Sequence, residues 1–321
     1  MELADLNPSS LLRQGLLGMS RNDQLRQVIE QAPVSRDVVR RFVGGVTTAD
    51  AVATASELVD TRRLVSIDYL GEDTVDPAQA TRTREAYVEL LGALAEAGLT
   101  AGGTVEVSLK LSALGQALGR DGNKIALENA RGICQAAANA GTTVTLDMED
   151  HTTTDLTLSV LRDLRQDWPW VGAVLQSYLY RTEQDCRDLA HEGSRVRLCK
   201  GTYREPETVA FQDKGEVDRA YVRCLKILLE GQGYPMIATH DPRLVEIATV
   251  LAEKAQREAD SYEFQMLLGI RPEEQLRLAA AGARMRVYLP YGEEWYGYLM
   301  RRMAERPANL GFFLRGLATK G

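Results

Sequence analysis

The sequence predicts an α/β protein, a (βα)8 barrel of the TIM type that follows an N-terminal helical arm. From about residue 60, short runs rich in Val, Ile, Leu or Thr alternate with amphipathic helical stretches, the pattern of βα units in a parallel sheet. Eight such runs lie within roughly 260 residues, the usual size of this barrel. An open doubly wound sheet is the alternative, but it would be expected to carry G-x-G-x-x-G after its first strand. The sequence contains neither this fingerprint nor a Walker A loop.

The arm is predicted over residues 1–55, where "DQLRQVIEQAP" and "SRDVVRRFVGG" are short helical patterns that end in helix breakers. The barrel is predicted over residues 56–321. Its strands are expected in the runs "LVSIDYLG", "TVEVSLKLS", "TVTLDME", "VGAVLQSY", "RVRLCKGTY", "MIATHD", "YEFQMLLG" and "RMRVYLP". Helices are expected between them, for example over 77–98, 128–141, 218–233 and 242–259, and several end in Gly just before the next strand.

The composition excludes several classes of protein. Of 321 residues, 45% are hydrophobic and 26% are charged, which is typical of a globular chain with a large core. A net charge of −7 argues against nucleic acid as a partner. The first residues, "MELADLNPSS", lack the layout of a signal peptide, and no apolar run approaches the roughly 18 residues that a bilayer span needs. We therefore expect a cytoplasmic protein, with peripheral contact at the inner face of the membrane left open.

The four cysteines are expected to be reduced. They form no C-x-x-C pair, and with only three histidines in the chain no zinc spacing can be built from them.

Polar residues recur near the ends of the predicted strands, where the active site of such a barrel lies. Any one of them is more often a structural residue, but nearly every strand contributes one, which indicates a shared pocket. They are Asp68, Lys110, Asp147, Glu149, Gln176, Arg197, Lys200, Thr239, His240, Gln265 and Tyr288.

Arg197 is the clearest of these residues. Side chains alternate along a strand, so Arg197 shares a face with Cys199, whereas Val196 and Leu198 lie opposite. Because parallel barrel strands are covered on both sides, a guanidinium in mid-strand needs a buried acceptor. An ion pair with Asp147 is the structural explanation, and an electron-rich ligand is the functional one.

Lys110 lies between Leu109 and Leu111 in another apolar strand. Three interpretations remain open from its position: a Schiff-base nucleophile, a structural ion pair and an anion-binding group.

The run "LDMEDH" offers oxygen and nitrogen donors for a metal. Adjacent strand residues point to opposite faces, so at most Asp147 and Glu149 aim together without a turn. We favour a loop followed by a helix N-cap in "DHTTTD", and we predict no metal.

A helix is predicted after "YLPYG", and it carries two adjacent arginines. Residues three and four apart share a helix face, so Tyr298 and Glu305 each neighbour both Arg301 and Arg302. An exposed stripe with ordinary surface pairs is the alternative. Lys110, arriving from a strand end, favours a pocket in which three cations bind a carboxylate or a phosphate.

These motifs resemble the proline dehydrogenase family in its single-activity bacterial form. The residues that carry the resemblance are "YLPYGEEWYGYLMRRMAE", "SLKLSAL", "RLCKGTY", "IATHD" and "YEFQMLLG", in family order. The resemblance extends roughly from "SIDYLGE" to "FFLRG". It implies an FAD-dependent enzyme that oxidises L-proline to Δ1-pyrroline-5-carboxylate, and flavin bound at the barrel mouth without the dinucleotide fingerprint.

The resemblance also implies roles for residues on matching positions. Arg301, Arg302 and Lys110 would hold the proline carboxylate, and Asp147 would order these cations. Tyr288, Tyr298 and Leu267 would pack on the pyrrolidine ring. The FAD contacts would be Gln176, Arg197 (beside flavin N5), Lys200, Gly201, Tyr203, Thr239, His240, Gln265 and Glu305.

The implied reaction passes a hydride equivalent from proline C5 to flavin N5, and electrons then go to a membrane quinone. This implies transient peripheral membrane contact, for which Arg36, Arg40 and Arg41 of the arm are candidates, and release of product to a separate pyrroline-5-carboxylate dehydrogenase. The chain departs from the family pattern at Thr202, Arg204, Leu268 and Pro307, which bears on the flavin environment and the electron acceptor. The alternatives are a lysine- or metal-dependent barrel lyase and a non-catalytic binding protein.

Overall fold

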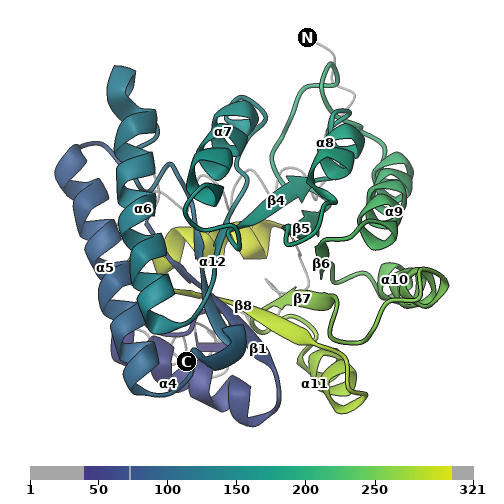
Figure 1. Cartoon of the computed structure of the whole chain (residues 1–321), viewed down its shortest axis with the longest axis horizontal. Coiled ribbons are helices and arrows are strands. Elements are labelled where there is room, and N and C mark those ends of the chain that lie inside the picture. Colours follow the sequence, from purple (N-terminus) through teal and green to yellow (C-terminus); the bar gives the residue numbers. More distant parts are fainter. Residues whose placement is uncertain (1–39, 72–73, 306–321) are drawn as a thin grey trace, which may run out of the picture.

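The computed structural model describes residues 40–71 and 74–305, and for 301–305 it describes the helical backbone alone. Eight parallel strands close into a barrel in sequence order, with β1 hydrogen-bonded to β8 (Figure 1). They are β1 Leu64–Tyr69, β2 Val105–Leu109, β3 Val144–Leu146, β4 Gly172–Gln176, β5 Arg195–Cys199, β6 Tyr234–Ala238, β7 Glu263–Leu267 and β8 Met285–Tyr291. The predicted (βα)8 barrel is confirmed, and each strand overlaps its predicted run.

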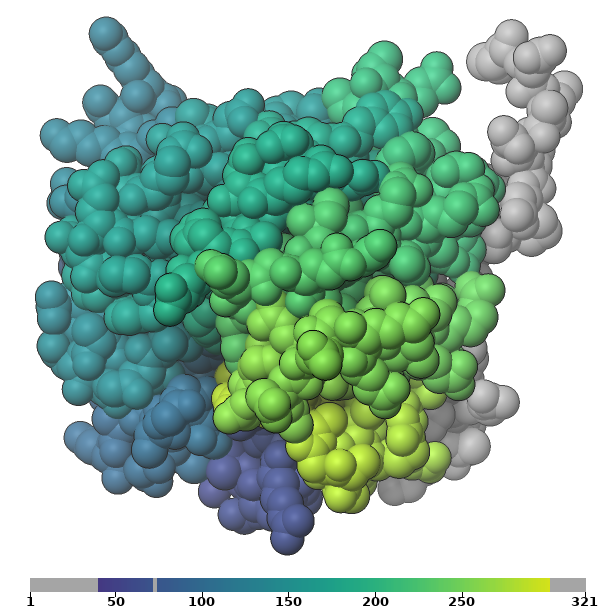
Figure 2. All heavy atoms as spheres, turned by 45° about the vertical axis from the view of Figure 1, so that its right-hand side comes forward, coloured from purple at the N-terminus to yellow at the C-terminus, as the bar shows by residue number. Residues whose placement is uncertain are grey.

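Most of the helices lie around the outside of the barrel between consecutive strands (Figure 1), and their side chains cover the face seen in Figure 2. They are α4 Thr48–Asp60, α5 Pro77–Glu96, α6 Gly122–Ala140, α7 Thr154–Arg165, α8 Thr182–Leu189, α9 Lys214–Glu230, α10 Pro242–Lys254, α11 Pro272–Ala280 and α12 Trp295–Glu305. Short 3-10 helices, η1 Ala101–Gly103 and η2 Gly119–Asp121, precede β2 and α6.

Local sequence signals set several helix ends. Asp76 caps α5 by accepting a hydrogen bond from the Gln79 backbone N–H, and Pro77 occupies the first turn. Helix α10 ends at Lys254, several residues before the predicted end. Gln256 adopts a positive φ of 54°, and Arg257 then turns back to donate to backbone carbonyls that include Gly231 O, at 2.6 Å.

The two faces of the barrel wall differ in chemistry. On the outer face, Val65, Ile67 and Val107 belong to one large apolar cluster with residues of the surrounding helices. On the inner face, the alternate positions carry serine, carboxylate and guanidinium groups that contact one another across the barrel. Glu106 and Arg286 are buried there. The interior is therefore a polar network inside an apolar wall.

The predicted boundary between arm and barrel falls inside a helix. Helix α4 crosses residues 55 and 56, and its Ala51 and Ala55 are fully buried in the main core. Residues 1–39 of the arm predicted over 1–55 lie outside the described residues, so the division of the chain stays a prediction. All four cysteines are free. Within residues 40–71 and 74–305, we find no helix with the length and apolar character that a membrane span requires.

Candidate active site

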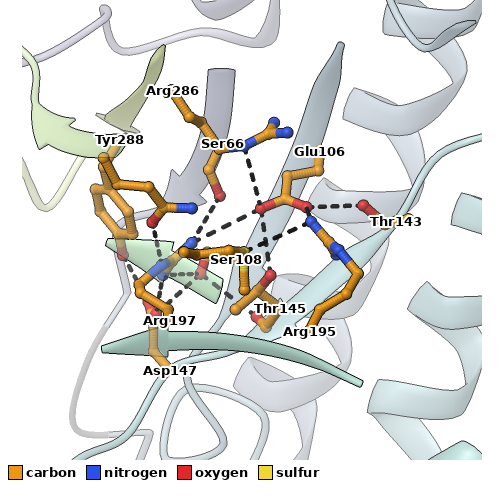
Figure 3. A network of polar contacts seen from close by, with 12 residues as sticks. Ser66, Glu106, Ser108, Thr143, Thr145, Asp147, Arg195, Arg197, Arg286 and Tyr288 are labelled. Carbon is orange, nitrogen blue, oxygen red and sulfur yellow. Dashed lines mark hydrogen bonds and ion pairs between the residues drawn. The ribbon is translucent and has the colours of Figure 1, made fainter. Parts of the chain in front are cut away.

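Arg197 of β5 lies inside the barrel and binds groups from several other strands (Figure 3). Its Nη1 donates to Asp147 Oδ1, just after β3, at 2.6 Å and to Ser108 Oγ of β2 at 2.9 Å. Its Nη2 donates to Ser66 Oγ of β1 at 3.1 Å, and its Nε donates to Gln265 Oε1 of β7 at 2.5 Å. The predicted ion pair with Asp147 is present, and the guanidinium is held in one orientation.

Tyr288 of β8 completes this cluster. Its hydroxyl donates to Asp147 Oδ2 at 2.6 Å, and the Arg197 guanidinium lies 5.3 Å from the ring centroid. Burial and the charge of Asp147 raise the pKa of Tyr288 well above its ordinary value, so the hydroxyl stays a donor. Burial alone would lower the pKa of Arg197, but the carboxylates of Asp147 and Glu106 outweigh it and the pKa is raised.

Lys110 follows β2 at the same end of the barrel. Its Nζ lies 2.5 Å from Asp68 Oδ2 of β1, and its side chain is 17% exposed. Asp68 in turn is 3.4 Å from the hydroxyl of Tyr87, which donates to Ser108 O at 2.7 Å. Of the three interpretations of Lys110, the ion pair is therefore the one seen in the structure. It also leaves an ammonium group at the mouth of the barrel.

Helix α12, shown in yellow in Figure 1, packs on the carboxyl ends of the strands. Tyr298 is buried in an apolar cluster with Leu70, which follows β1, and Ile270, which follows β7; Leu267 packs against this cluster. The helix predicted for the arginine pair is thus confirmed. Arg301, Arg302 and Glu305 lie in its last turns, where their side chains are outside what the structure describes.

Four more predicted residues surround the same mouth. Gln176, the last residue of β4, donates to Glu149 O at 2.7 Å. Thr239 and His240 directly follow β6, and Thr239 is buried. The Leu267 backbone N–H donates to His240 Nε2 at 2.9 Å, so this nitrogen carries a lone pair and any ring proton is on Nδ1.

Lys200, which follows β5, pairs with two carboxylates. Its Nζ lies 2.5 Å from Asp218 Oδ1 and 3.3 Å from Asp241 Oδ2. Tyr203, on the loop that follows, is 40% exposed. These two residues therefore border the mouth rather than the buried cluster.

The loop after β5 is fixed in place by close packing and hydrogen bonds. Gly201 has a φ of 110°, and a Cβ at this position would come within 2.3 Å of the Tyr178 ring. The Tyr178 hydroxyl donates to Glu205 Oε1 at 3.2 Å, and Glu205 also binds the backbone N–H and Nδ1 of His151. Glycine is required at position 201, and the loop is tied to the loop after β3.

The donors of "LDMEDH" diverge. Asp147 faces Arg197, whereas Glu149 accepts from the backbone N–H and the hydroxyl of Ser112. Asp150 accepts from the Thr152 backbone N–H at 2.8 Å, and this turn leads into α7. Over the described ranges, no group of three or more His, Cys, Asp or Glu side chains is arranged to hold a metal ion.

The sequence reasoning missed the deeper half of the interior network. Glu106 accepts from Arg195 Nη2 at 2.6 Å, and Glu263 accepts from Arg286 Nε at 2.6 Å. Strand alternation could have found them, because Glu106 shares a face with Ser108, and Glu263 and Arg286 share faces with Gln265 and Tyr288. These residues begin the strands rather than end them, which is why a search of strand ends passed over them.

The comparison of sequences identifies the family. A family model described as proline dehydrogenase matches residues 51–315. The chain belongs to the proline dehydrogenase family. Proline dehydrogenase 1 of Bacillus subtilis (strain 168) is 39% identical over 310 residues, which cover 97% of this chain and all of that relative. Proline dehydrogenase of Deinococcus radiodurans is 39% identical over 311 residues, covering 96% and 98% of the two chains.

Solved structures place the proline dehydrogenase barrel within larger proteins as well. The crystal structure of proline utilization A (PutA) from Bdellovibrio bacteriovorus, inactivated by N-propargylglycine, superposes with a TM-score of 0.78 at 26% identity. The match covers 89% of this chain and 34% of that chain, so this chain spans about a third of the PutA structure. Both comparisons confirm the family and the fold that the motifs predicted.

Proposed function

We propose that this chain oxidises L-proline to Δ1-pyrroline-5-carboxylate with FAD as its bound cofactor and a quinone as the final electron acceptor. The observation that carries the proposal is the Arg197–Asp147–Tyr288 cluster, in which Arg197 is buried, beneath Lys110 and α12 at the mouth where such barrels bind substrate. Family membership supports proline as the substrate.

The residues at the mouth fit a flavin cofactor. The ends of β4 to β7 present amide, guanidinium, ammonium and hydroxyl donors, which suit the carbonyl groups of a flavin and the phosphates of FAD. The set is Gln176, Arg197, Lys200, Gly201, Tyr203, Thr239, His240 and Gln265, with Glu305 proposed on α12. When bound, FAD supplies through N5 the acceptor for the hydride equivalent that leaves proline C5.

The chain's own side chains would bind and orient the substrate. Arg301, Arg302 and Lys110 are proposed to hold the proline carboxylate, because three cations from a helix and a strand end suit one anion. Tyr288 and Tyr298, together with Leu267, are proposed to pack on the ring. The substrate amine is proposed to bind deprotonated, so that its lone pair forms the C=N bond as C5 loses the hydride. The resulting iminium then releases its N–H proton to water to give the imine.

Asp147 is proposed to keep the cationic groups in position. Its two oxygens accept hydrogen bonds from Arg197 of β5 and Tyr288 of β8, so two strands fix the orientation of the carboxylate. The proposed quinone implies transient contact with a membrane surface, and the proposed location is cytoplasmic, with that contact at the inner face of the membrane. The product would pass to a separate pyrroline-5-carboxylate dehydrogenase.

The first experiment is a visible absorption spectrum of the purified chain, followed by anaerobic addition of L-proline. We expect a flavin spectrum that is bleached by proline. Arg301→Ala and Arg302→Ala should then each lower kcat/KM for proline. The expected loss of transition-state stabilisation is roughly 2–5 kcal/mol, the scale for truncating one partner of a buried ion pair. Arg277→Ala is the matched control, since Arg277 is a surface arginine paired with Glu274.

The outcomes separate the parts of the proposal. A flavin that stays oxidised with proline would keep the cofactor and contradict the substrate. A colourless protein that FAD does not reconstitute would contradict the cofactor. Unchanged proline kinetics in both arginine variants would contradict the carboxylate assignment alone.

A further inference from the structure

The opposite end of the barrel contains a cavity of about 220 Å³. Its lining residues lie at or just before the first residues of the strands, so it is at the amino ends and far from the site described above. Arg195, Tyr234 and Glu263 begin β5, β6 and β7, and Arg195 precedes Lys200 by five residues, roughly 16 Å of extended strand. The lining residues are Gly102, Gly103, Thr143, Arg195, Tyr234, Glu263, Arg284 and Arg286.

The charges inside the barrel balance without Arg284. The interior network pairs three guanidinium groups with three carboxylates, those of Arg195, Arg197, Arg286, Glu106, Glu263 and Asp147. Arg284 lies just before β8 and forms no ion pair within the described part of the chain. The cavity mouth therefore has at least one positive charge that no carboxylate of the described chain compensates.

A second cation, Arg165, lies next to Arg195 and contacts its backbone carbonyl. Arg165 donates to backbone carbonyls, Val171 O at 2.9 Å and Arg195 O at 3.4 Å, and no carboxylate of the described residues pairs with it. Burial, and to a smaller extent the nearby charge of Arg195, lower the pKa of Arg165 to about 10.

Two buried donors at the cavity also have no hydrogen-bond acceptor. They are Nη1 of Arg195 and Nε of Arg284. Both guanidinium groups lie beside the ring of Tyr234, at 5.9 and 5.8 Å from its centroid. Because a buried donor without an acceptor is costly, two such donors that share one aromatic ring indicate a place for an acceptor from outside the described chain.

We propose that this cavity is a binding site for a small oxyanion, a free phosphate or carboxylate. An anion in this cavity would lie beside the guanidinium groups of Arg195 and Arg284, which line it, and would compensate the excess positive charge. The volume equals that of roughly seven liquid waters, enough for a phosphate or a small carboxylate with part of its hydration. The site goes beyond the proposed oxidation of proline and does not depend on it.

The test is isothermal titration of the full chain with inorganic phosphate and, in a separate arm, with acetate. Sodium chloride keeps the ionic strength constant, so that screening is not scored as binding. Arg284→Gln removes the uncompensated charge and should weaken binding at least about tenfold. Arg277→Gln is its control, because it removes one guanidinium from a surface pair on α11.

A second pair of variants keeps the charges of the network unchanged. Gly102 lines the cavity with φ +64°, and a Cβ there meets nothing within 4 Å. Asn and Asp tolerate this backbone conformation, so both Gly102→Asn and Gly102→Asp should fold. They have nearly the same shape, but only the aspartate repels an anion.

We expect saturable binding of phosphate or acetate that Gly102→Asp and Arg284→Gln weaken and that Gly102→Asn and Arg277→Gln preserve. The arm that binds more tightly identifies the oxyanion. Equal binding by Gly102→Asp and Gly102→Asn would overturn the proposal, as would wild-type affinity in Arg284→Gln. So would a flat titration of the wild-type chain with both anions.

Discussion

The two halves of the barrel interior contain ion pairs of a similar kind, but their carboxylates differ in exposure to solvent. In the half at the amino ends of the strands, Glu106 and Glu263 are fully buried and each accepts from a guanidinium, Arg195 and Arg286 respectively. Arg286 is 2% exposed and also donates to the backbone carbonyl of Val65 at 2.8 Å. Glu106, Glu263 and Arg286 have almost no contact with solvent and hold strands together, whereas Arg195 is 13% exposed where it lines the cavity.

In the half at the carboxyl ends, the same chemistry reaches the surface. Asp147 is 12% exposed and Lys110 is 17% exposed, although both are paired, with Arg197 and Asp68. Their partners fix them in orientations that a ligand can approach. The difference lies in the carboxylates: Glu106 and Glu263 are fully buried and hold strands together in a structural half, whereas Asp147 is partly accessible in a half fit for binding the substrate.

The largest expected effect tests the structural half. Arg286→Met keeps much of the side-chain volume but leaves Glu263 buried without its guanidinium. Removing one partner of a buried pair costs about 3–5 kcal/mol, so we expect the free energy of unfolding to fall by that amount. Urea denaturation measures it, and the proline kcat/KM of the folded fraction should change little.

The control for this prediction is Arg277→Met, which breaks an exposed pair with Glu274 and should cost less than about 1 kcal/mol. If Arg286→Met unfolds at the same urea concentration as the wild type, the ion pairs of the structural half do not stabilise the barrel. The division of the interior into two halves would then be wrong.

A smaller effect is expected from pH. Burial would raise the pKa of Glu106, but the charges of Arg195, Arg286 and Arg197 outweigh it and lower the pKa below its ordinary 4.5. Burial would also raise the pKa of Glu263, and the charge of Arg286 lowers it. Both carboxylates stay ionised in the folded chain at pH values where the unfolded chain binds protons.

Their contribution to stability is therefore complete above pH 4.5 and is lost as the pH falls below it. We expect the free energy of unfolding to decrease there by up to about 1.4 kcal/mol per pH unit for each group. Urea denaturation between pH 3 and pH 7 measures this slope. Glu106→Gln should reduce the slope, because it removes one titrating group; an unchanged slope would show that Glu106 is not ionised in the folded chain at low pH.

The sequence predicted the barrel well because alternation, helix ends and strand count are local signals. It also predicted a buried acceptor for Arg197, because Val196 and Leu198 occupy the other face of a strand that is covered on both sides. It did not predict the partner of Lys110. Asp68 lies on β1, 42 positions away, and the pairing depends on the register that sets Asp68 beside Ser108. Contacts of this kind depend on the register between paired strands, which no local pattern encodes.

The smallest effect is expected in the half fit for binding, from Asp68→Asn. An amide holds Lys110 less firmly than a carboxylate does, so the ammonium group should lose its fixed position at the mouth. Because Lys110 can reach water, the stability should fall by only about 1 kcal/mol. The proline kcat/KM should fall at least about tenfold, an effect of roughly 1.4 kcal/mol on the transition state.

Tyr87→Phe is the matched control, because it removes the hydroxyl 3.4 Å from Asp68 and leaves the pair with Lys110 intact. It should affect stability more than turnover, since this hydroxyl also binds the backbone of Ser108 at 2.7 Å. If Asp68→Asn lost stability while keeping kcat/KM, the Lys110 pair would belong with the structural half. Loss of kcat/KM with stability retained would make Asp68 a positioning residue. Arg286→Met would then lower mainly the stability and Asp68→Asn mainly kcat/KM, which would distinguish the two halves.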